Sequence, residues 1–298
     1  MIYKRAQPMP EREEREMQWK GRRASGNVVD RRGIPVKGIA GGGIGTIVMI
    51  IIVMMLGGNP SDVIDLTQIQ GPDTSTPYVA SAEEEELAQF ASVVLAETED
   101  TWVALLEQEG IAYVYPKLVL YTGKVDSACG VAGSSTGPFY CSGDQSVYID
   151  LSFFLEMEEK LNASGDFAMA YVIAHEVGHH IQNILGTMDQ VMAMRSKVDE
   201  VEFNRYMVRL ELQADYYAGV WAHFADKDNL LDEGDIDEAM NAASAVGDDR
   251  LQQQSYGYVV PDSFTHGTSE QRQRWFKKGY IAGTIADGDT FSVNDSEL

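Results

Sequence analysis

The sequence A-H-E-V-G-H-H-I, residues 174–181, places the strongest constraints on fold and chemistry. His175 and His179 are four residues apart, so on a helix both imidazoles share one face and can bind the same metal ion. Glu176 follows the first histidine directly, where its carboxylate can reach a water molecule beside that metal without itself being a ligand. Apolar neighbours predict a buried helix over residues 167–185, with Gly186 as its C-cap.

The position of a third ligand separates the known classes of such helices. The metzincin pattern needs glycine three residues, and histidine six residues, after the second histidine. Gln182 and Leu185 occupy these positions, so that class is excluded. Instead, E-L-Q-A-D at 211–215 supplies Glu211 as the third ligand of a His₂Glu zinc site, on a helix expected over 198–224. Asp215, one turn further on the same face, can accept the other ring N–H of a ligating histidine.

The remaining histidines do not support a different metal chemistry. Residues 176–179 also read E-x-x-H, a unit of di-iron carboxylate sites, but no other histidine has an acid three residues before it. His180 is expected to pack or to form a hydrogen bond. His266 lies in a predicted loop, where it could donate to the oxyanion of an attacked carbonyl or could simply be a surface histidine.

The N-terminal region combines a basic segment with an apolar one. Residues 1–37 carry ten Lys or Arg and five acids, whereas the rest of the chain carries 13 basic and 41 acidic residues, a net charge of −28. Residues 38–56 contain no charged side chain and, as a helix, are long enough to span a bilayer. The distribution of Lys and Arg favours a single-pass anchor with a cytoplasmic N-terminus and an extracytoplasmic body. A buried helix or a cleaved signal peptide are the alternatives.

Two further features concern partners and compartment. Gly38/Gly42 and Gly41/Gly45 have the spacing of close helix contacts, a weak indication of a homo-oligomer formed through the anchor. Cys129 and Cys141 are the only cysteines, and in an oxidising compartment we expect them to form a disulfide. The acidic composition argues against a nucleic-acid partner.

The order of these segments predicts an α+β protein in four parts. Residues 1–37 are expected to be a disordered cytoplasmic tail, 38–56 the transmembrane helix, 57–80 a linker and 81–298 the catalytic domain. Ser81 and Glu84 form a capping-box pattern at the domain's start. Aromatic and β-branched residues predict strands at 113–121 and 146–154, and helices follow, including one over 235–254.

Several long stretches resemble the neutral zinc metallopeptidase family of bacterial membrane-anchored proteins. They are W-K-G-R-R-A-S-G-N-V-V-D-R-R-G (19–33), G-P-F-Y-C (137–141) with V-Y-I-D-L-S-F-F (147–154), A-Y-V-I-A-H-E-V-G-H-H-I-Q (170–182), R-L-E-L-Q-A-D-Y-Y-A-G-V-W-A-H (209–223), N-A-A-S-A-V-G-D-D-R-L-Q (241–252) and T-H-G-T-S-E-Q-R-Q-R-W-F (265–276). The last is also similar to a histidine loop of the heat-shock and CAAX-processing membrane peptidases, except that those usually have proline where this chain has Gly267.

The resemblance implies a zincin-like domain, with a small sheet and the HExxH helix, that cleaves peptide bonds with Zn²⁺. It also implies an edge strand that pairs with the extended substrate, assigned here to Val147, Tyr148, Ile149 and Asp150. The predicted activity is zinc-dependent endopeptidase cleavage of extracytoplasmic proteins or peptides, with Glu176 as general base. The alternatives are a zinc-stabilised membrane-anchored adaptor that binds envelope proteins without cutting them, and a structural anchor with an inert site.

Overall fold

The chain folds into a mixed α+β domain that is mostly helical and contains a small sheet. The computed structural model describes residues 17–34 and 78–298. The elements are β1 (Val28–Asp30), α3 (Ala82–Gln108), β2 (Lys117–Tyr121), β3 (Lys124–Ser127), β4 (Gly130–Gly133), η1 (Ser134–Thr136), β5 (Phe139–Cys141), β6 (Ser146–Asp150), α4 (Ser152–Leu161), α5 (Asp166–Leu185), α6 (Thr187–Met192), α7 (Glu200–Lys227), α8 (Asp235–Ala245), α9 (Asp248–Tyr256), η2 (Pro261–Ser263), α10 (Ser269–Ala282), η3 (Ala286–Gly288) and η4 (Asp295–Glu297).

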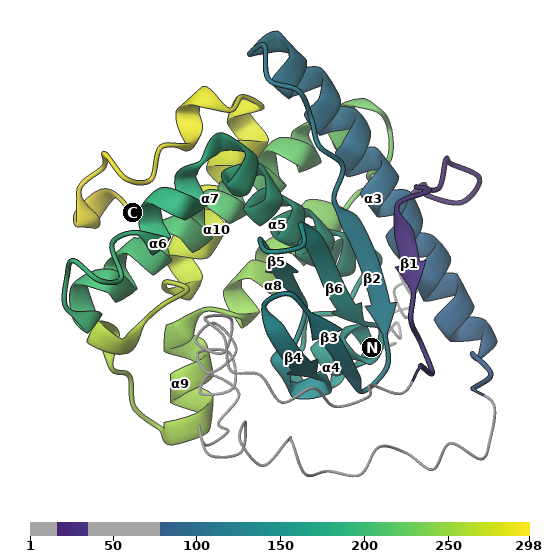
Figure 1. Cartoon of the computed structure of the whole chain (residues 1–298), viewed down its shortest axis with the longest axis horizontal. Helices are drawn as coiled ribbons and strands as arrows, with labels where there is room; N and C mark the ends of the chain where they lie inside the picture. The colour runs from purple at the N-terminus through teal and green to yellow at the C-terminus, as the bar shows by residue number, and fades with distance from the viewer. Residues whose placement is uncertain (1–16, 35–77) are drawn as a thin grey trace, which may run out of the picture.

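The main sheet has the strand order β1-β2-β6-β5 (Figure 1). β1 and β6 both run parallel to β2, and β5 runs antiparallel to β6. Alternate residues of β6 face opposite sides: Val147 and Ile149 join the helical core, while Tyr148 packs under the β3–β4 hairpin. A strand buried on both faces in this way reads as a continuous apolar run, which is why the sequence indicated a strand here.

The helix that carries His175 and His179 is α5, and it crosses α7 at very short distance. A Cβ atom added to Gly178 would lie 2.9 Å from the carbonyl oxygen of Ala214, so α5 and α7 touch backbone to backbone at this point. Gly178 lies between His175 and His179, and Ala214 lies between Glu211 and Asp215. The contact therefore brings the two predicted halves of the metal site together. The predicted C-cap is confirmed, because Gly186 ends α5 in the left-handed conformation with φ 77°.

Residues 17–34 were expected to belong to a disordered tail, and this expectation is wrong. Trp19 is 5% exposed and packs edge-on against Phe90 of α3. Asn27 and Ser25 both donate hydrogen bonds to the buried Glu99, and β1 adds a parallel strand to β2. The prediction of disorder followed from the many charged residues among the first 37. A few apolar and β-forming side chains in the same stretch suffice to fix residues 17–34 on the domain.

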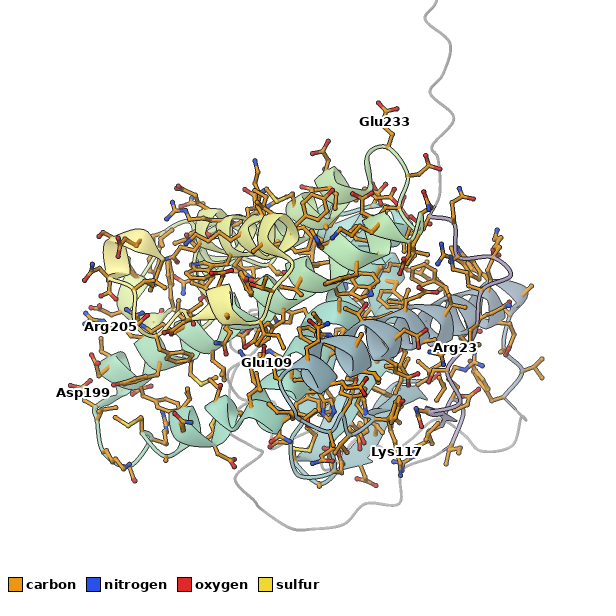
Figure 2. All side chains as sticks on the ribbon, turned by 90° about the horizontal axis from the view of Figure 1, so that it is seen from above. Arg23, Glu109, Lys117, Asp199, Arg205 and Glu233 are labelled. Atoms are coloured by element: carbon orange, nitrogen blue, oxygen red, sulfur yellow. A yellow bond between two sulfur atoms is a disulfide. The ribbon has the colours of Figure 1, made fainter. Side chains whose placement is uncertain are left out.

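Charged side chains of the same segment also line the surface of α3. Arg23 donates to the carbonyl of Ala96 and to Asp100, and it stands beside α3 in Figure 2. Arg32 is buried between Asp30 and Glu85. The segment is therefore held by its polar as well as its apolar groups.

Two other predictions changed at the level of single elements. The helix expected over 235–254 is divided into α8 and α9. At the division a Cβ atom added to Gly247 would lie 2.3 Å from the backbone nitrogen of Ser269, so a side chain does not fit there. The capping box at the start of α3 is confirmed, with Ser81 and Glu84 each accepting from the other's backbone N–H. Within residues 17–34 and 78–298, no helix has the length and apolarity that a membrane crossing requires. The predicted anchor at 38–56 lies outside these ranges.

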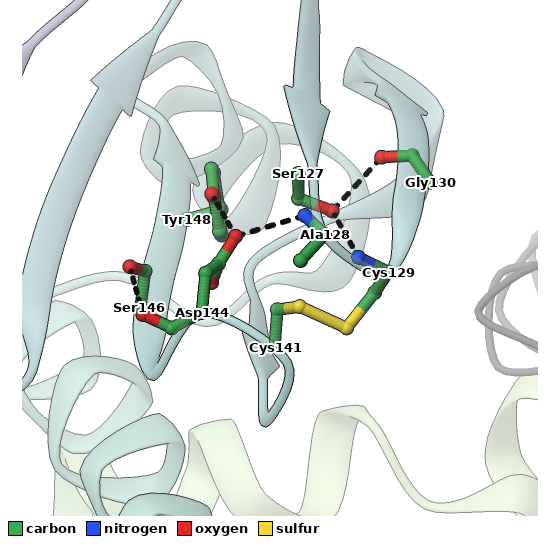
Figure 3. Close-up of a disulfide and its surroundings, with 8 residues drawn as sticks. All are labelled: Ser127, Ala128, Cys129, Gly130, Cys141, Asp144, Ser146 and Tyr148. Atoms are coloured by element: carbon green, nitrogen blue, oxygen red, sulfur yellow. Dashed lines mark hydrogen bonds between the residues drawn. A yellow bond between two sulfur atoms is a disulfide. The ribbon is translucent and has the colours of Figure 1, made fainter.

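The predicted disulfide between Cys129 and Cys141 is present (Figure 3). It joins the β3–β4 turn to the end of β5, and Cys141 is completely buried. Asp144 braces the same corner by accepting hydrogen bonds from the backbone of Ala128 and the hydroxyl of Tyr148. The β3–β4 hairpin is thus tied covalently to the strand at the margin of the main sheet.

Candidate metal centre

His175, His179 and Glu211 converge as the sequence predicted. Each offers one ligand atom, and these atoms all lie within 4.8 Å of one another. The Nε2 atom of His175 is 3.2 Å from Glu211 Oε2, and that of His179 is 3.4 Å from Glu211 Oε1. Two imidazole nitrogens and one carboxylate, all buried, are a donor set suited to a catalytic zinc ion.

The ionisation of these groups reflects their burial and mutual attraction. Burial opposes the charged form of His175, but Asp215 and Glu211 outweigh it and raise the pKa of the imidazole to about 9. Burial also opposes the charged form of Glu211, and for a carboxyl group this would raise the pKa. The charges of His179 and His266 and the hydrogen bonds from the imidazoles outweigh burial and hold the pKa of Glu211 well below its usual value. The metal-free site therefore holds a proton that a bound cation would displace.

Glu176 lies beside this group without joining it. Its side chain is 8% exposed, and burial raises the pKa of its carboxyl, opposed by the charges of His179 and His175. It is absent from the cluster of ligand atoms. A buried carboxylate next to the metal-binding atoms, with some remaining contact with solvent, fits a group that takes a proton from a water molecule.

Asp215 lies against His175, on the side of the ring away from Glu211. Its Oδ1 atom is 2.8 Å from His175 Nδ1 and 2.5 Å from the hydroxyl of Tyr171. Arg272 of α10 donates to both oxygens of the same carboxylate. Tyr171 was not identified from the sequence, although its position one turn before His175 on α5 could have indicated contact with the same partner.

A single buried carboxylate, that of Asp248, holds the backbone of the loop that carries His266. Asp248 Oδ2 accepts hydrogen bonds from the backbone N–H groups of Thr265, His266 and Gly267. The other oxygen, Oδ1, lies 3.7 Å from His266 Nδ1, and Thr265 Oγ1 lies 2.9 Å from that same nitrogen. The Nδ1 edge of the imidazole is therefore engaged by the protein, which leaves Nε2 for a ligand.

The backbone conformation at position 267 explains why this chain has glycine there rather than proline. Its φ is +87°, a value that the proline ring cannot adopt, and a Cβ atom there would lie 3.3 Å from Leu212 and from Val208 of α7. These two residues flank Glu211 along α7. The departure from the proline pattern therefore accompanies a loop that is pressed against the helix carrying the third ligand.

The predicted substrate edge strand is wrong. Val147, Tyr148, Ile149 and Asp150 form β6, which lies between β2 and β5 and is buried throughout. The strands at the two margins are β1 and β5, and the one next to β6 is β5, which is short and follows Gly137 and Pro138. Tyr140 of β5 contacts α5 through its hydroxyl, 2.9 Å from His180 Nδ1. His180 is thus hydrogen-bonded, as expected, and its other nitrogen bonds to the carbonyl of Val114.

Fold and site together define an α+β protein whose buried His₂Glu group can bind a metal ion. The family model described as “Putative neutral zinc metallopeptidase” matches residues 17–291, and the chain belongs to this family. The uncharacterized protein YpfJ of Escherichia coli is 50% identical over 284 residues, which cover 92% of this chain and 99% of that protein. The uncharacterized protein Rv2575 of Mycobacterium tuberculosis is 37% identical over 260 residues, covering 81% and 86%. No solved structure matches the chain.

The family match includes the N-terminal segment, residues 17–34, as well as the helices of the metal site. This range agrees with the packing of Trp19 and β1 on the domain. It also supports zinc as the metal for the His₂Glu group, since the family is described as a zinc peptidase family.

Proposed function

We propose that the protein is a zinc-dependent endopeptidase that hydrolyses peptide bonds of extracytoplasmic proteins or peptides. The observation that carries the proposal is the buried convergence of His175, His179 and Glu211, with Glu176 beside them but outside the ligand set. Zinc bound there would supply a Lewis acid that acidifies water and polarises the scissile carbonyl.

The side chains of the protein can then divide the remaining work. Glu176 takes the proton of the attacking water and passes it to the leaving amine. Asp215 keeps the ring of His175 in place. His266, held through its Nδ1 edge, can present Nε2–H to the oxygen on which negative charge develops.

We assign substrate binding not to β6 but to the outer edge of β5, which pairs with no other strand of residues 17–34 and 78–298. An extended peptide that adds to this edge would lie along the active-site helix, because Tyr140 connects β5 to His180. The disulfide between Cys129 and Cys141 supports action in an oxidising compartment, outside the cytoplasm.

Replacement of the general base gives the direct test. The Glu176→Gln variant should retain zinc by metal analysis but lose cleavage of an unfolded protein substrate by about 100-fold or more. Glu233→Gln, an equivalent change at an exposed loop acid visible in Figure 2, is the matched control and should keep full activity. If the zinc-loaded wild type cleaves no better than Glu176→Gln, the non-cleaving adaptor becomes the better description.

A further inference from the structure

His179 is supported by two glutamines on the side away from the metal-binding atoms. Its Nδ1 atom lies 2.8 Å from Gln182 Oε1. Gln182 Nε2 in turn donates to the carbonyl of Leu210 at 2.6 Å and to Gln213 Oε1 at 3.2 Å. Gln213 Nε2 donates to the carbonyl of Gly288 at 2.8 Å. All three residues are buried, each less than 8% exposed, so water does not replace these partners freely.

Backbone carbonyls set the direction of the hydrogen bonds that connect Gly288, Gln213, Gln182 and His179. A carbonyl can only accept, so the amide groups of Gln213 and Gln182 must turn their NH₂ ends toward Gly288 and Leu210. The carbonyl end of Gln182 is then left facing His179 Nδ1, and an acceptor in that position requires the proton on this nitrogen. The neutral ring consequently has its lone pair on Nε2, the atom that faces Glu211.

We propose that Gln182 is a positioning residue that holds His179 in the tautomer and orientation needed for zinc, with Gln213 as its support. This inference rests on the proposed metal site, but not on peptidase activity. Gln182 occupies the place that a metzincin fills with glycine. In the sequence, Gln182 served only to exclude the metzincin class. In the structure, it accepts a hydrogen bond from a candidate zinc ligand.

The two histidine ligands are thus held by different chemistry. His175 is oriented by the carboxylate of Asp215, whose charge is balanced by Arg272. His179 is oriented by a neutral amide, and no basic side chain of the described residues pairs with Gln182. A carboxylate at this position would add a further buried acidic group to Glu176, Glu211 and Asp215, and it would face the carbonyl of Leu210 without a proton to donate.

The chain of amides also makes the metal site depend on the segment after α10. Gly288 ends η3, and the following residues are fastened to α7: Thr290 Oγ1 donates to the carbonyl of Arg209, and Arg209 donates to that of Val293. Gly288 is therefore a fixed acceptor rather than a mobile one. The orientation of His179 is in this way determined by contacts far from it in sequence.

Zinc affinity of substituted full-length proteins tests the proposal. Gln182→Leu, which keeps the volume but removes the acceptor, should weaken zinc binding about 10- to 100-fold in competition with a chelator. It should also change the visible spectrum of the Co²⁺-substituted protein, because the imidazole is free to rotate. Gln213→Leu should have a smaller effect of several-fold, since the carbonyl of Leu210 still directs Gln182. Gln190→Leu, the same substitution at an exposed residue of α6, is the control and should match the wild type.

The thermal midpoint of the metal-free proteins separates positioning from general destabilisation. A positioning role lowers zinc affinity and alters the Co²⁺ spectrum in proteins whose metal-free melting stays close to that of the wild type. Wild-type zinc affinity and an unaltered Co²⁺ spectrum in Gln182→Leu would overturn the proposal. If Gln182→Leu does not fold, Gln213→Leu decides, and affinity equal to that of Gln190→Leu overturns it. A protein whose zinc affinity depends on Gln182 but which cleaves nothing would refute the peptidase function alone.

Discussion

Arg272 and Asp215 form a buried, two-pronged ion pair behind the metal centre. Arg272 Nε is 2.8 Å from Asp215 Oδ2, and Nη2 is 2.9 Å from Oδ1. Arg272 is 3% exposed and Asp215 is fully buried. The same carboxylate receives His175 Nδ1 and the hydroxyl of Tyr171, so one acidic group joins α5, α7 and α10. The orientation of His175, a candidate metal ligand, and the packing of three helices thus depend on one pair of charges.

We predict that Arg272→Met destabilises the metal-free protein by about 3–5 kcal/mol, because it breaks a buried ion pair and leaves only the His175 imidazole to compensate the charge of Asp215. Adding Asp215→Asn should recover part of the loss, since the uncompensated charge is then removed. Urea denaturation of the two single variants and the double variant at pH 7 measures this coupling. Losses that simply add in the double variant would show that the two residues act independently.

The contact between Asp248 and the His266 loop gives a second prediction. Asp248→Asn retains an oxygen that can accept the three backbone hydrogen bonds but removes the negative charge beside His266. We expect kcat to fall about 10-fold with little change in KM, as for lost transition-state stabilisation. Zinc content should not change, because Asp248 is not among the ligand atoms.

A double-variant cycle distinguishes this role from a structural one. If Asp248 acts through His266, then Asp248→Asn should cost nothing further in a protein that already carries His266→Ala. Independent losses of activity in the two variants would instead mean that Asp248 matters only for the loop's stability.

The local part of the metal site could be predicted from the sequence. The spacing of His175 and His179, and of Glu211 and Asp215, fixes which side chains share a helix face, and the structure keeps both faces. The crossing at Gly178 that joins the helices is compatible with the sequence but is not implied by it. Tertiary contacts decide it, because glycine inside a helix carries no sign of the backbone that will approach it.

Non-local features could not be predicted in the same way. Strand order places β6 inside the sheet, and a buried strand has the same apolar residues whether or not it borders the substrate. The docking of residues 17–34 was missed because composition averaged over the segment hid Trp19, a single large side chain that packs into the core. The direction of the hydrogen bonds at Gln182 depends on carbonyls at residues 210 and 288, which no sequence pattern connects.

A third prediction concerns pH and Asp235 at the start of α8. Burial raises the pKa of its carboxyl to about 6, aided by the nearby charge of Asp232. Within the described part of the chain, Oδ1 has no hydrogen-bond partner, while Oδ2 accepts from the backbone of Asp232. Asp166 and Glu238 each place a carboxylate oxygen within 4.8 Å of that of Asp235. Both are acidic, so neither supplies a positive charge to compensate an ionised Asp235.

The sign of the effect follows from the raised value. Between the unfolded value of 3.8 and about 6 the folded protein binds more protons at Asp235, so its stability contribution falls as pH rises through this window. Asp235→Asn keeps an acceptor for Asp232 and should be more stable than the wild type at pH 7 by about 1 kcal/mol. The difference should shrink toward pH 4.5 in denaturation curves. A difference that is constant with pH would exclude titration of Asp235 as its cause.

The last prediction concerns membrane topology. β1 and β2 are adjacent strands of one sheet, paired from Val28 with Leu118 to Asp30 with Leu120, so residues 17–34 and the body lie on the same side of any membrane. A single crossing at 38–56 would put them on opposite sides, which is incompatible with this sheet. We therefore expect both parts to face one compartment, whatever path the intervening residues take.

Ala24→Cys and Ser196→Cys place single thiols at exposed positions of the two parts, since both native cysteines are disulfide-bonded. A membrane-impermeant maleimide added to intact cells should label both variants or neither, and both should react after lysis. Labelling of Ser196→Cys alone would restore the single-pass arrangement and would mean that β1 does not pair with β2 in the cell.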